Sequence, residues 1–436
     1  MGEPVIARKV PRREALRYWW RLGWLSFGGP AGQIAMMHTD LVEKRRWLSE
    51  GRFLHGLNYT MALPGPEAQQ LAIYIGWLLH GTWGGIVAGT LFVLPSLVLM
   101  VLAGWAYLAY GELPAVAGVL WGVKPVIVAI IVLAAWRIGR RVLGRPAYGV
   151  VAGAAFVAIA IFELPFPLII GAAATTGAVL ARYSPAWIAG VDTAVTDSGA
   201  DPRGPAVIDD DTPQPARARF SWGRIARLTA IGIGLWFAAM AATVAVFGTD
   251  SVQVALGWFF TKVALVTFGG AYAVLPYVFQ AAVTEYSWVT TTQMIDGLAL
   301  GESTPGPLIM VVAFVGYLAG AGEGGTTGAV TAAAVVTFFA FLPSYLFILL
   351  GAPLVEAARD LNILRGPMSA VTAAVVGVIT HLALFFAGAV FVTPVGIDWA
   401  AVVVAVVAFV ALLSGRLGIP FAVLLGGAVG LVTHIV

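Results

Sequence analysis

The stretch LNYTMALPGPEAQQLAIYIGW, Leu57–Trp77, is apolar enough to lie in a membrane, yet Pro64-Gly65-Pro66 and the carboxylate of Glu67 interrupt its centre. A proline inside a helix removes a backbone hydrogen bond and clashes with the preceding turn, so two prolines around a glycine predict a break. In lipid, the N–H and C=O groups freed by a break need partners. A break therefore survives only inside protein or beside a water-filled cavity. The stretch predicts a helix interrupted at mid-membrane.

The composition of the whole chain agrees with a membrane protein. Of its 436 residues, 60% are hydrophobic and 11% are charged, whereas a soluble protein carries about 25% charged residues. Long uncharged runs such as Val87–Leu108 and Ile231–Phe247 predict membrane-spanning helices. The blocks of Ala, Val, Gly and Leu do not alternate as the strands of a porin-like barrel do. The sequence therefore predicts an all-α polytopic membrane protein.

Several classes of function find no support in the sequence. The absence of cysteine excludes disulfides and thiolate metal sites. No HExxH, Walker A or GxSxG motif occurs, so we expect no enzyme, no cofactor and no metal. The basic residues cluster beside apolar segments, which argues against nucleic-acid binding. The N-terminus has no apolar core with a cleavage site, so we expect a basic amphipathic segment at the membrane surface, with Trp19, Trp20 and Trp24 at the headgroup level.

The two halves of the chain repeat one another. An interval of 241 residues separates Phe27-Gly28-Gly29 from Phe268-Gly269-Gly270, and the same interval separates Trp47 from Trp288. It also separates Pro64-Gly65-Pro66 from Pro305-Gly306-Pro307. Three unrelated landmarks in one register indicate an internal duplication. The domains we expect are a basic segment 1–21, a first repeat 22–182, a hydrophilic flexible linker 183–221, a linking helix 222–250 and a second repeat 251–436.

Lys and Arg predict the orientation of the segments. Basic clusters at Arg8–Arg21, Lys44–Arg52, Arg137–Arg145 and Arg217–Arg227 would all face the cytoplasm. Residues 22–42 and 53–80 then become re-entrant hairpins with their breaks at the tips, although two full spans for either hairpin stay an alternative. We expect spans at about 83–108, 114–136, 147–162, 165–182, 225–247, 326–351 and 367–389, and repeats of inverted topology.

The interrupted helices would make an anion site. A helix that restarts after a break presents unpaired N–H groups and the positive end of its dipole, and glycines let the backbone approach a ligand closely. Packing glycines and proline kinks are the alternative reading. The candidate substrate-binding residues near the breaks are Gly28, Gly29, Pro30, Gln33, Asn58, Pro64, Gly65, Pro66, Gln69, Gln70, Gly269, Gly270, Tyr272, Ser303, Thr304, Pro305, Gly306 and Pro307.

Four ionisable residues within apolar sequence add to this site. Lys124 and Lys262 are candidate substrate-binding cations, because a charge within the membrane usually faces the protein interior or a cavity; for Lys262 the alternative is a side chain that reaches the membrane surface. Glu67 and Glu302 are candidates to carry a coupling proton, although Glu67 in the first turn of a helix also fits a purely electrostatic role.

FGGPAGQIA, LPGPEAQQLAIYIGW, FGGAYAVLPY and STPGP together resemble the chromate ion transporter family, in its two-domain form, over the whole chain. The resemblance implies a secondary transporter in the inner (plasma) membrane that exports chromate, driven by membrane potential or a proton gradient, and confers chromate resistance. Sulfate or another oxyanion carrier, or an anion channel, stays an alternative. The implied partners are chromate or sulfate and membrane lipids; a homodimer is left open. Ala271 replaces Pro30 in the second copy, which weakens the expectation of a helix start there.

Overall fold

The computed structural model describes residues 10–183, 206–209, 212, 221–268, 271–357, 365–394 and 396–435. Within these residues the chain is helical apart from two two-residue strands, β1 (Val392–Thr393) and β2 (Gly396–Ile397), which pair antiparallel. The helices of the first half are α1 (Arg12–Leu25), α2 (Gly29–His38), the π-helix η1 (Thr39–Lys44), α3 (Glu50–Met61), α4 (Glu67–Tyr110), α5 (Pro114–Val142), α6 (Pro146–Ala160) and α7 (Phe166–Tyr183). Those of the second half are α8 (Trp222–Phe247), α9 (Val252–Val266), α10 (Ala271–Phe279), the π-helix η4 (Gln280–Glu285), α11 (Thr291–Ser303), the short η5 (Leu308–Met310), α12 (Val311–Ala357), α13 (Arg365–Phe391), α14 (Trp399–Leu413) and α15 (Ile419–Ile435).

The helices confirm the prediction of a polytopic α-helical membrane protein. Among the described residues, 6 helices are long and apolar enough to cross a bilayer, and four shorter apolar helices accompany them. Those of spanning length are Glu67–Tyr110, Pro114–Val142, Phe166–Tyr183, Trp222–Phe247, Leu308–Pro353 and Gly366–Phe391.

The first half begins with two excursions that return to the same end of α1. After α1 and α2 the chain comes back to where it started, because the Arg45 guanidinium lies 3.2 Å from the Glu14 carboxylate. After α3 and the first part of α4 it comes back again, with the His80 ring 2.9 Å from the carbonyl of Val10. The breaks at Gly28-Gly29 and at Pro64-Gly65-Pro66 therefore lie at the far tips of these excursions.

Helix α4 is itself a tight hairpin. Gly81 has φ 73° and ψ −159°, which interrupts the helix, and the two segments on either side pack face to face, with Gly76 against Gly84. In α12 the corresponding turn falls at Gly324 and Gly325. Glycine is suited to both turns because it adopts positive φ without steric cost.

The second half follows the first element by element. The π-helices η1 and η4 both begin and end exactly 241 residues apart. Arg46 and Ser287, at the same interval, share a rare positive φ of 53° and 52°. Such agreement in local backbone extends the sequence repeat into the structure.

Corresponding long segments run in opposite directions. Gly85 of α4 lies against Leu349 of α12 and Gly89 lies against Tyr345, so the partner number falls as the chain number rises. Helices α5 and α15, which are not counterparts, also pack antiparallel, because Gly118 meets Gly430 and Gly122 meets Gly426. With respect to a bilayer, inverted topology stays a prediction.

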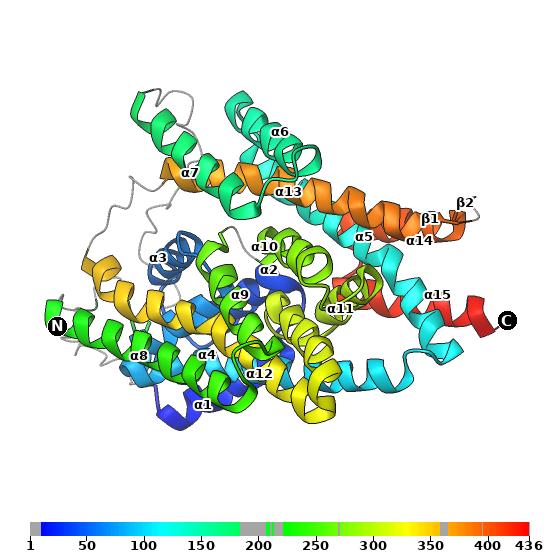
Figure 1. The fold of residues 1–436 in the computed structure, drawn as a ribbon. Coiled ribbons are helices and arrows are strands. Elements are labelled where there is room, and N and C mark those ends of the chain that lie inside the picture. The colour runs from blue at the N-terminus through cyan, green and yellow to red at the C-terminus, as the bar shows by residue number, and fades with distance from the viewer. Residues whose placement is uncertain are drawn as a thin grey trace.

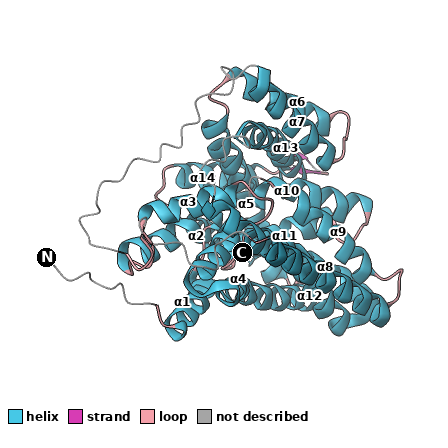
Figure 2. Cartoon of the chain, turned by 90° about the vertical axis from the view of Figure 1, so that its left-hand side faces the viewer, coloured by secondary structure: helices cyan, strands magenta, loops and turns pink. Residues whose placement is uncertain are grey.

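The last helices of each half exchange partners. Helix α5 packs along α14 and α15 of the second half, whereas α13, its counterpart, packs along α6 and α7 of the first. Figure 1 shows α6, α7 and α13 lying together at one edge and α15 beside α5. Seen from the side, α6, α7 and α13 again form a group apart from α8 and α12 (Figure 2). The two halves are therefore interleaved rather than set side by side.

Part of the predicted linker is docked on the protein. Val207 N–H donates to the Arg46 carbonyl at 2.9 Å, and Ile208 N–H donates to the Trp47 carbonyl at 3.0 Å. The Arg52 guanidinium donates to the carbonyls of Asp209 and Thr212. We call residues 206–209 and 212 the strap. Most of the rest of the predicted linker lies outside the described residues.

Helix α1 runs across the boundary we placed between residues 21 and 22, whereas its counterpart α9 lies wholly within the expected second repeat. Trp19 is wrong as a headgroup residue, because it is 2% exposed and packs with Tyr18 inside the protein, whereas Trp20 is 46% exposed. Neighbouring residues of a helix point in different directions, so Trp19 lies on the face of α1 that packs against the protein and Trp20 lies on the exposed face.

Candidate functional site

Three of the predicted breaks and the end of α9 meet at one place. The Gly65 N–H donates to the Thr267 carbonyl at 2.7 Å, and the Gly306 N–H donates to the Ser26 carbonyl at 3.0 Å. Thr267 stands 241 residues after Ser26, and Gly306 stands 241 residues after Gly65. Each half thus donates an equivalent backbone hydrogen bond to the other half. We call this place the junction; Gly269 and Gly270, which belong to the fourth break, lie outside the described residues.

Glycine is required at both Pro-Gly-Pro turns. Gly65 has φ 129° and Gly306 has φ 107°. Residues that carry a side chain rarely adopt such positive φ angles. A Cβ on Gly65 would lie 2.6 Å from the Ser344 hydroxyl oxygen, and a Cβ on Gly306 would lie 2.6 Å from the Ser96 Cβ. The turns are therefore shaped by backbone conformation and by close packing against the opposite half.

Two glutamines brace the junction through backbone carbonyls. The Gln33 side-chain amide donates to the Ser26 carbonyl at 3.1 Å and also to the Gly306 carbonyl. The Gln70 amide donates to the Pro64 carbonyl at 2.7 Å. Both side chains are fully buried, so the predicted polar residues Gln33 and Gln70 do lie at the breaks. Gln69 is buried beside them.

Several buried polar atoms around the junction are without a partner among the described residues. They are the hydroxyl oxygens of Ser26, Ser96 and Ser344 and the side-chain carbonyl oxygens of Gln33 and Gln70. A buried polar atom without a partner costs about 1 to 3 kcal/mol, so a cluster of them needs an explanation such as water or a ligand. Hydroxyls can donate to an oxyanion, whereas the glutamine oxygens can accept from water.

A tyrosine of the second half lies near the first break and is hydrogen-bonded to a carboxylate. The Tyr272 hydroxyl donates to a Glu302 carboxylate oxygen at 2.6 Å, and a Cβ on Gly29 would lie 3.9 Å from the same hydroxyl. Glu302 is buried. Glu67 is half-buried in the first turn of α4, directly after the N-cap Pro66, and no hydrogen bond or ion pair of its side chain occurs within the described part of the chain.

Lys124 has a partner that the sequence did not indicate. Its ammonium lies 3.4 Å from one Asp296 oxygen, and the Tyr107 hydroxyl donates to the other at 3.0 Å. Asp296 is not among the candidate site residues of the sequence analysis. Its place inside the apolar helix α11, nine residues before Pro305, was the signal that marks it.

Other predicted site residues are not brought into the junction. Lys262 is exposed on α9 and Asn58 is exposed on α3. The hydroxyls of Ser303 and Thr304 donate to the carbonyls of Leu300 and Gly301 at the end of α11. The prolines, by contrast, belong to the breaks that form the junction: Pro30 is half-buried in the first turn of α2, Pro64 is half-buried, and Pro305 and Pro307 are buried at the second turn.

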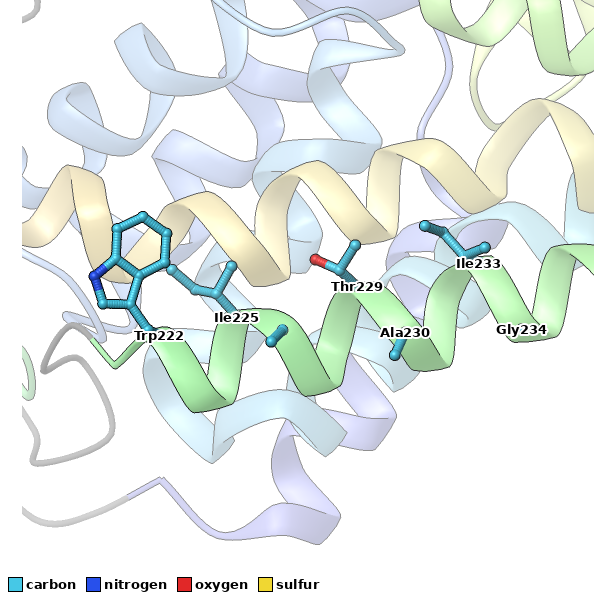
Figure 3. Close-up of a pocket in the computed structure, with 7 residues that line it drawn as sticks. Trp222, Ile225, Thr229, Ala230, Ile233 and Gly234 are labelled. Atoms are coloured by element: carbon cyan, nitrogen blue, oxygen red, sulfur yellow. The ribbon is translucent and has the colours of Figure 1, made fainter.

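A surface hollow of about 630 Å³ lies elsewhere. It is lined by Trp222, Ile225, Thr229, Ile233 and their neighbours, all of them on α8 (Figure 3). None of these residues belongs to the breaks, and an apolar lining from one helix offers little to an ion. The buried junction is therefore the candidate site.

Comparison with known proteins shows the family of this chain. The family model described as chromate transporter matches residues 13–178 and 254–431. A chromate transport protein of Cupriavidus metallidurans is 30% identical over 86% of this chain and 82% of its own. One of Pseudomonas aeruginosa is 33% identical over 82% of this chain and 77% of its own.

A more distant relative is an uncharacterized transporter of Methanocaldococcus jannaschii, 23% identical over 90% of this chain and 87% of its own. No solved structure matches. The two regions matched by the family model start 241 residues apart, at the same interval as the junction bonds. This chain belongs to the chromate transporter family.

Proposed function

We propose that this protein is a secondary transporter that exports chromate, or a related tetrahedral oxyanion such as sulfate, from the cytoplasm across the plasma membrane. The observation that carries the proposal is the junction. There the N–H groups of Gly65 and Gly306 donate hydrogen bonds to the carbonyls of Thr267 and Ser26, and the buried serine hydroxyls around them have no partner among the described residues. Chromate resistance of the cell would follow from export.

The junction supplies what a small dianion needs. Helices α2 and α4 both begin there, so their unpaired N–H groups and positive dipole ends face the same place. Three serine hydroxyls add donors. Close approach of a tetrahedral ion to glycine backbone is sterically easy. Residues 28–30, 64–66 and 305–307 would therefore line the binding place.

The opposed halves support transport by alternating access. In transporters with inverted repeats, the substrate site lies where broken helices of the two halves meet, and the halves rock around it. The antiparallel contacts of α4 with α12 and of α5 with α15 suit such a mechanism. We therefore place the two halves in opposite orientations in the bilayer, with the strap on the cytoplasmic side.

Membrane potential alone is enough to drive export. Moving one charge across 100 mV is worth about 2.3 kcal/mol, and a dianion leaving an inside-negative cell gains that amount for each of its two charges. Proton coupling through Glu67 or Glu302 is the second candidate, favoured by the hydrogen bond of Glu302 with the Tyr272 hydroxyl, which lies near Gly29.

The test uses inside-out vesicles and labelled chromate and sulfate, with and without a collapsed potential. The variant Gly65→Ala, which meets the Ser344 hydroxyl and a positive φ, should abolish uptake. Gly153→Ala is the matched control, because nothing lies within 4 Å of a Cβ there. Equal uptake by both variants would contradict a site at the junction.

The same vesicles distinguish a carrier from an anion channel. A carrier saturates with substrate and exchanges labelled for unlabelled chromate from the opposite side. A flux that rises linearly with concentration, without exchange, would assign the channel instead.

A further inference from the structure

Tyr107, Lys124 and Asp296 form a second polar cluster outside the junction. They come from three different helices, α4, α5 and α11. One Asp296 oxygen accepts from the Tyr107 hydroxyl at 3.0 Å, and the other lies 3.4 Å from the Lys124 ammonium. Helices far apart in the sequence thus bring one cation and one anion together inside an apolar protein.

The ion pair leaves the lysine incompletely satisfied. The Asp296 side chain is 2% exposed, but that of Lys124 is 23% exposed. Lysine has three donors, and within the described residues its contact with Asp296 is the single one present for this ammonium. The Asp296 oxygen that faces Lys124 accepts no hydrogen bond there. The cation is accessible and has donors to offer.

The cluster lies at a fixed distance from the junction along two helices. Asp296 precedes Ser303, the last residue of α11 before the Pro305 turn, by seven residues, a rise of about 10 Å. Tyr107 follows Ser96 by eleven residues on α4, a rise of about 16 Å. From the junction, one rise runs toward the start of α11 and the other toward the end of α4, and the hydrogen bond between Tyr107 and Asp296 joins them at one place. The cluster therefore stands between the junction and one face of the protein.

The second half of the duplication does not repeat this cluster. At the 241-residue interval His55 corresponds to Asp296. The counterpart of α5 is α13, whose sequence RGPMSAVTAAVVGVITHLALFFAGAVF holds no lysine. Since the backbone is duplicated but this ion pair is not, packing of the fold does not require it. An ion pair that occurs at only one of the two positions related by the duplication suits a step of transport that has a direction.

We propose that Lys124 is a second station for the transported oxyanion, between the junction and one face of the protein, where Asp296 serves as its counter-ion when no oxyanion is bound. This rests on the proposed transport function. A tetrahedral dianion arriving at Lys124 competes with the Asp296 carboxylate, which Tyr107 retains. This competition keeps the affinity of Lys124 for the oxyanion low, so that the ion is released onward and is not trapped.

The experiment reconstitutes the full-length protein in proteoliposomes and measures chromate flux with sulfate added to either face. Asp296→Asn removes the competitor, and we expect sulfate from one face to inhibit at about a tenfold lower concentration, with slower turnover. Inhibition from the other face should stay unchanged. Lys124→Gln should lower flux, and Lys124→Arg should restore part of it.

The double variant Lys124→Gln/Asp296→Asn separates this role from a structural one, because it removes both buried charges together. The exposed Arg416→Gln is the control for loss of one positive charge. Flux at the wild-type level in the double variant would overturn the station, as would an unchanged response to sulfate in Asp296→Asn. If the proposed function itself failed, the wild-type protein would carry neither chromate nor sulfate.

Discussion

At the scale of single residues, the junction depends on two glycines, because they have no side chain. Gly65 and Gly306 have no Cβ where Ser344 and Ser96 of the opposite half approach. The sequence predicted both glycines from the Pro-Gly-Pro pattern alone. It could not predict Ser96 and Ser344, because those residues lie in otherwise ordinary apolar helices and reach the turns only through the fold.

Gly306→Ala should destabilise the protein for two separable reasons. A positive φ costs a non-glycine residue about 1 to 3 kcal/mol, and the new Cβ would lie 2.6 Å from the Ser96 Cβ. Adding Ser96→Gly removes the second cost alone. We expect the thermal unfolding temperature in detergent to fall in the single variant and to recover in part in the double variant. Full recovery would mean that the backbone conformation at Gly306 carries no strain.

Gln33 offers a test of charge at the junction. Gln33→Leu and Gln33→Glu both lose the amide that donates to Ser26 and Gly306, so both should lose about 1 to 3 kcal/mol of stability. The glutamate alone adds a negative charge. Chromate uptake should therefore need a higher substrate concentration in Gln33→Glu than in Gln33→Leu. Equal concentration dependence would argue that no anion passes there.

At the scale of elements, hydropathy and proline placed most of the helices. The expected span 225–247 lies within α8, and 114–136 lies within α5. The turn at Gly81 falls between the expected re-entrant hairpin 53–80 and the expected span 83–108, although no proline marks it. The π-helices η1 and η4 were missed, since an extra residue per turn leaves no local signature in composition.

The strap gives a prediction at this scale. Val207 and Ile208 donate to carbonyls of residues 46 and 47, so their amide hydrogens should exchange slowly with solvent. Arg52→Ala removes two donors that hold Asp209 and Thr212, and exchange at residues 207 and 208 should then be faster by at least about fivefold, as loss of about 1 kcal/mol implies. Exchange in the core of α5 serves as the internal control. Unchanged protection at the strap would mean that Arg52 does not hold it.

At the scale of the whole molecule, the halves complete each other. Helices α5 and α13 each have their main partners in the opposite half, and the bonds at Gly65 and Gly306 cross between halves. The sequence predicted the duplication from three landmarks at one interval. The exchange of partners could not be predicted, because the interval is the same whether two repeats stand apart or interleave.

Cutting the chain within residues 184–205 tests the exchange. Two separately expressed fragments should associate in the membrane and transport chromate, because the contacts between the halves do not depend on a continuous chain. Co-purification through a tag on one fragment measures the association. The first fragment expressed alone should be degraded, since α5 then lacks α14 and α15. A stable and active single fragment would contradict the need for the opposite half.

The partnership of α5 with α15 also bears on how the protein is made. Helix α5 ends at Val142 and α15 ends at Ile435, so nearly three hundred residues are synthesised after α5 before its main neighbour is complete. During that interval the glycines at positions 118 and 122, which will face Gly430 and Gly426, face lipid or the insertion machinery instead. The packing of α5 is therefore completed only after α15 has been synthesised and inserted beside it.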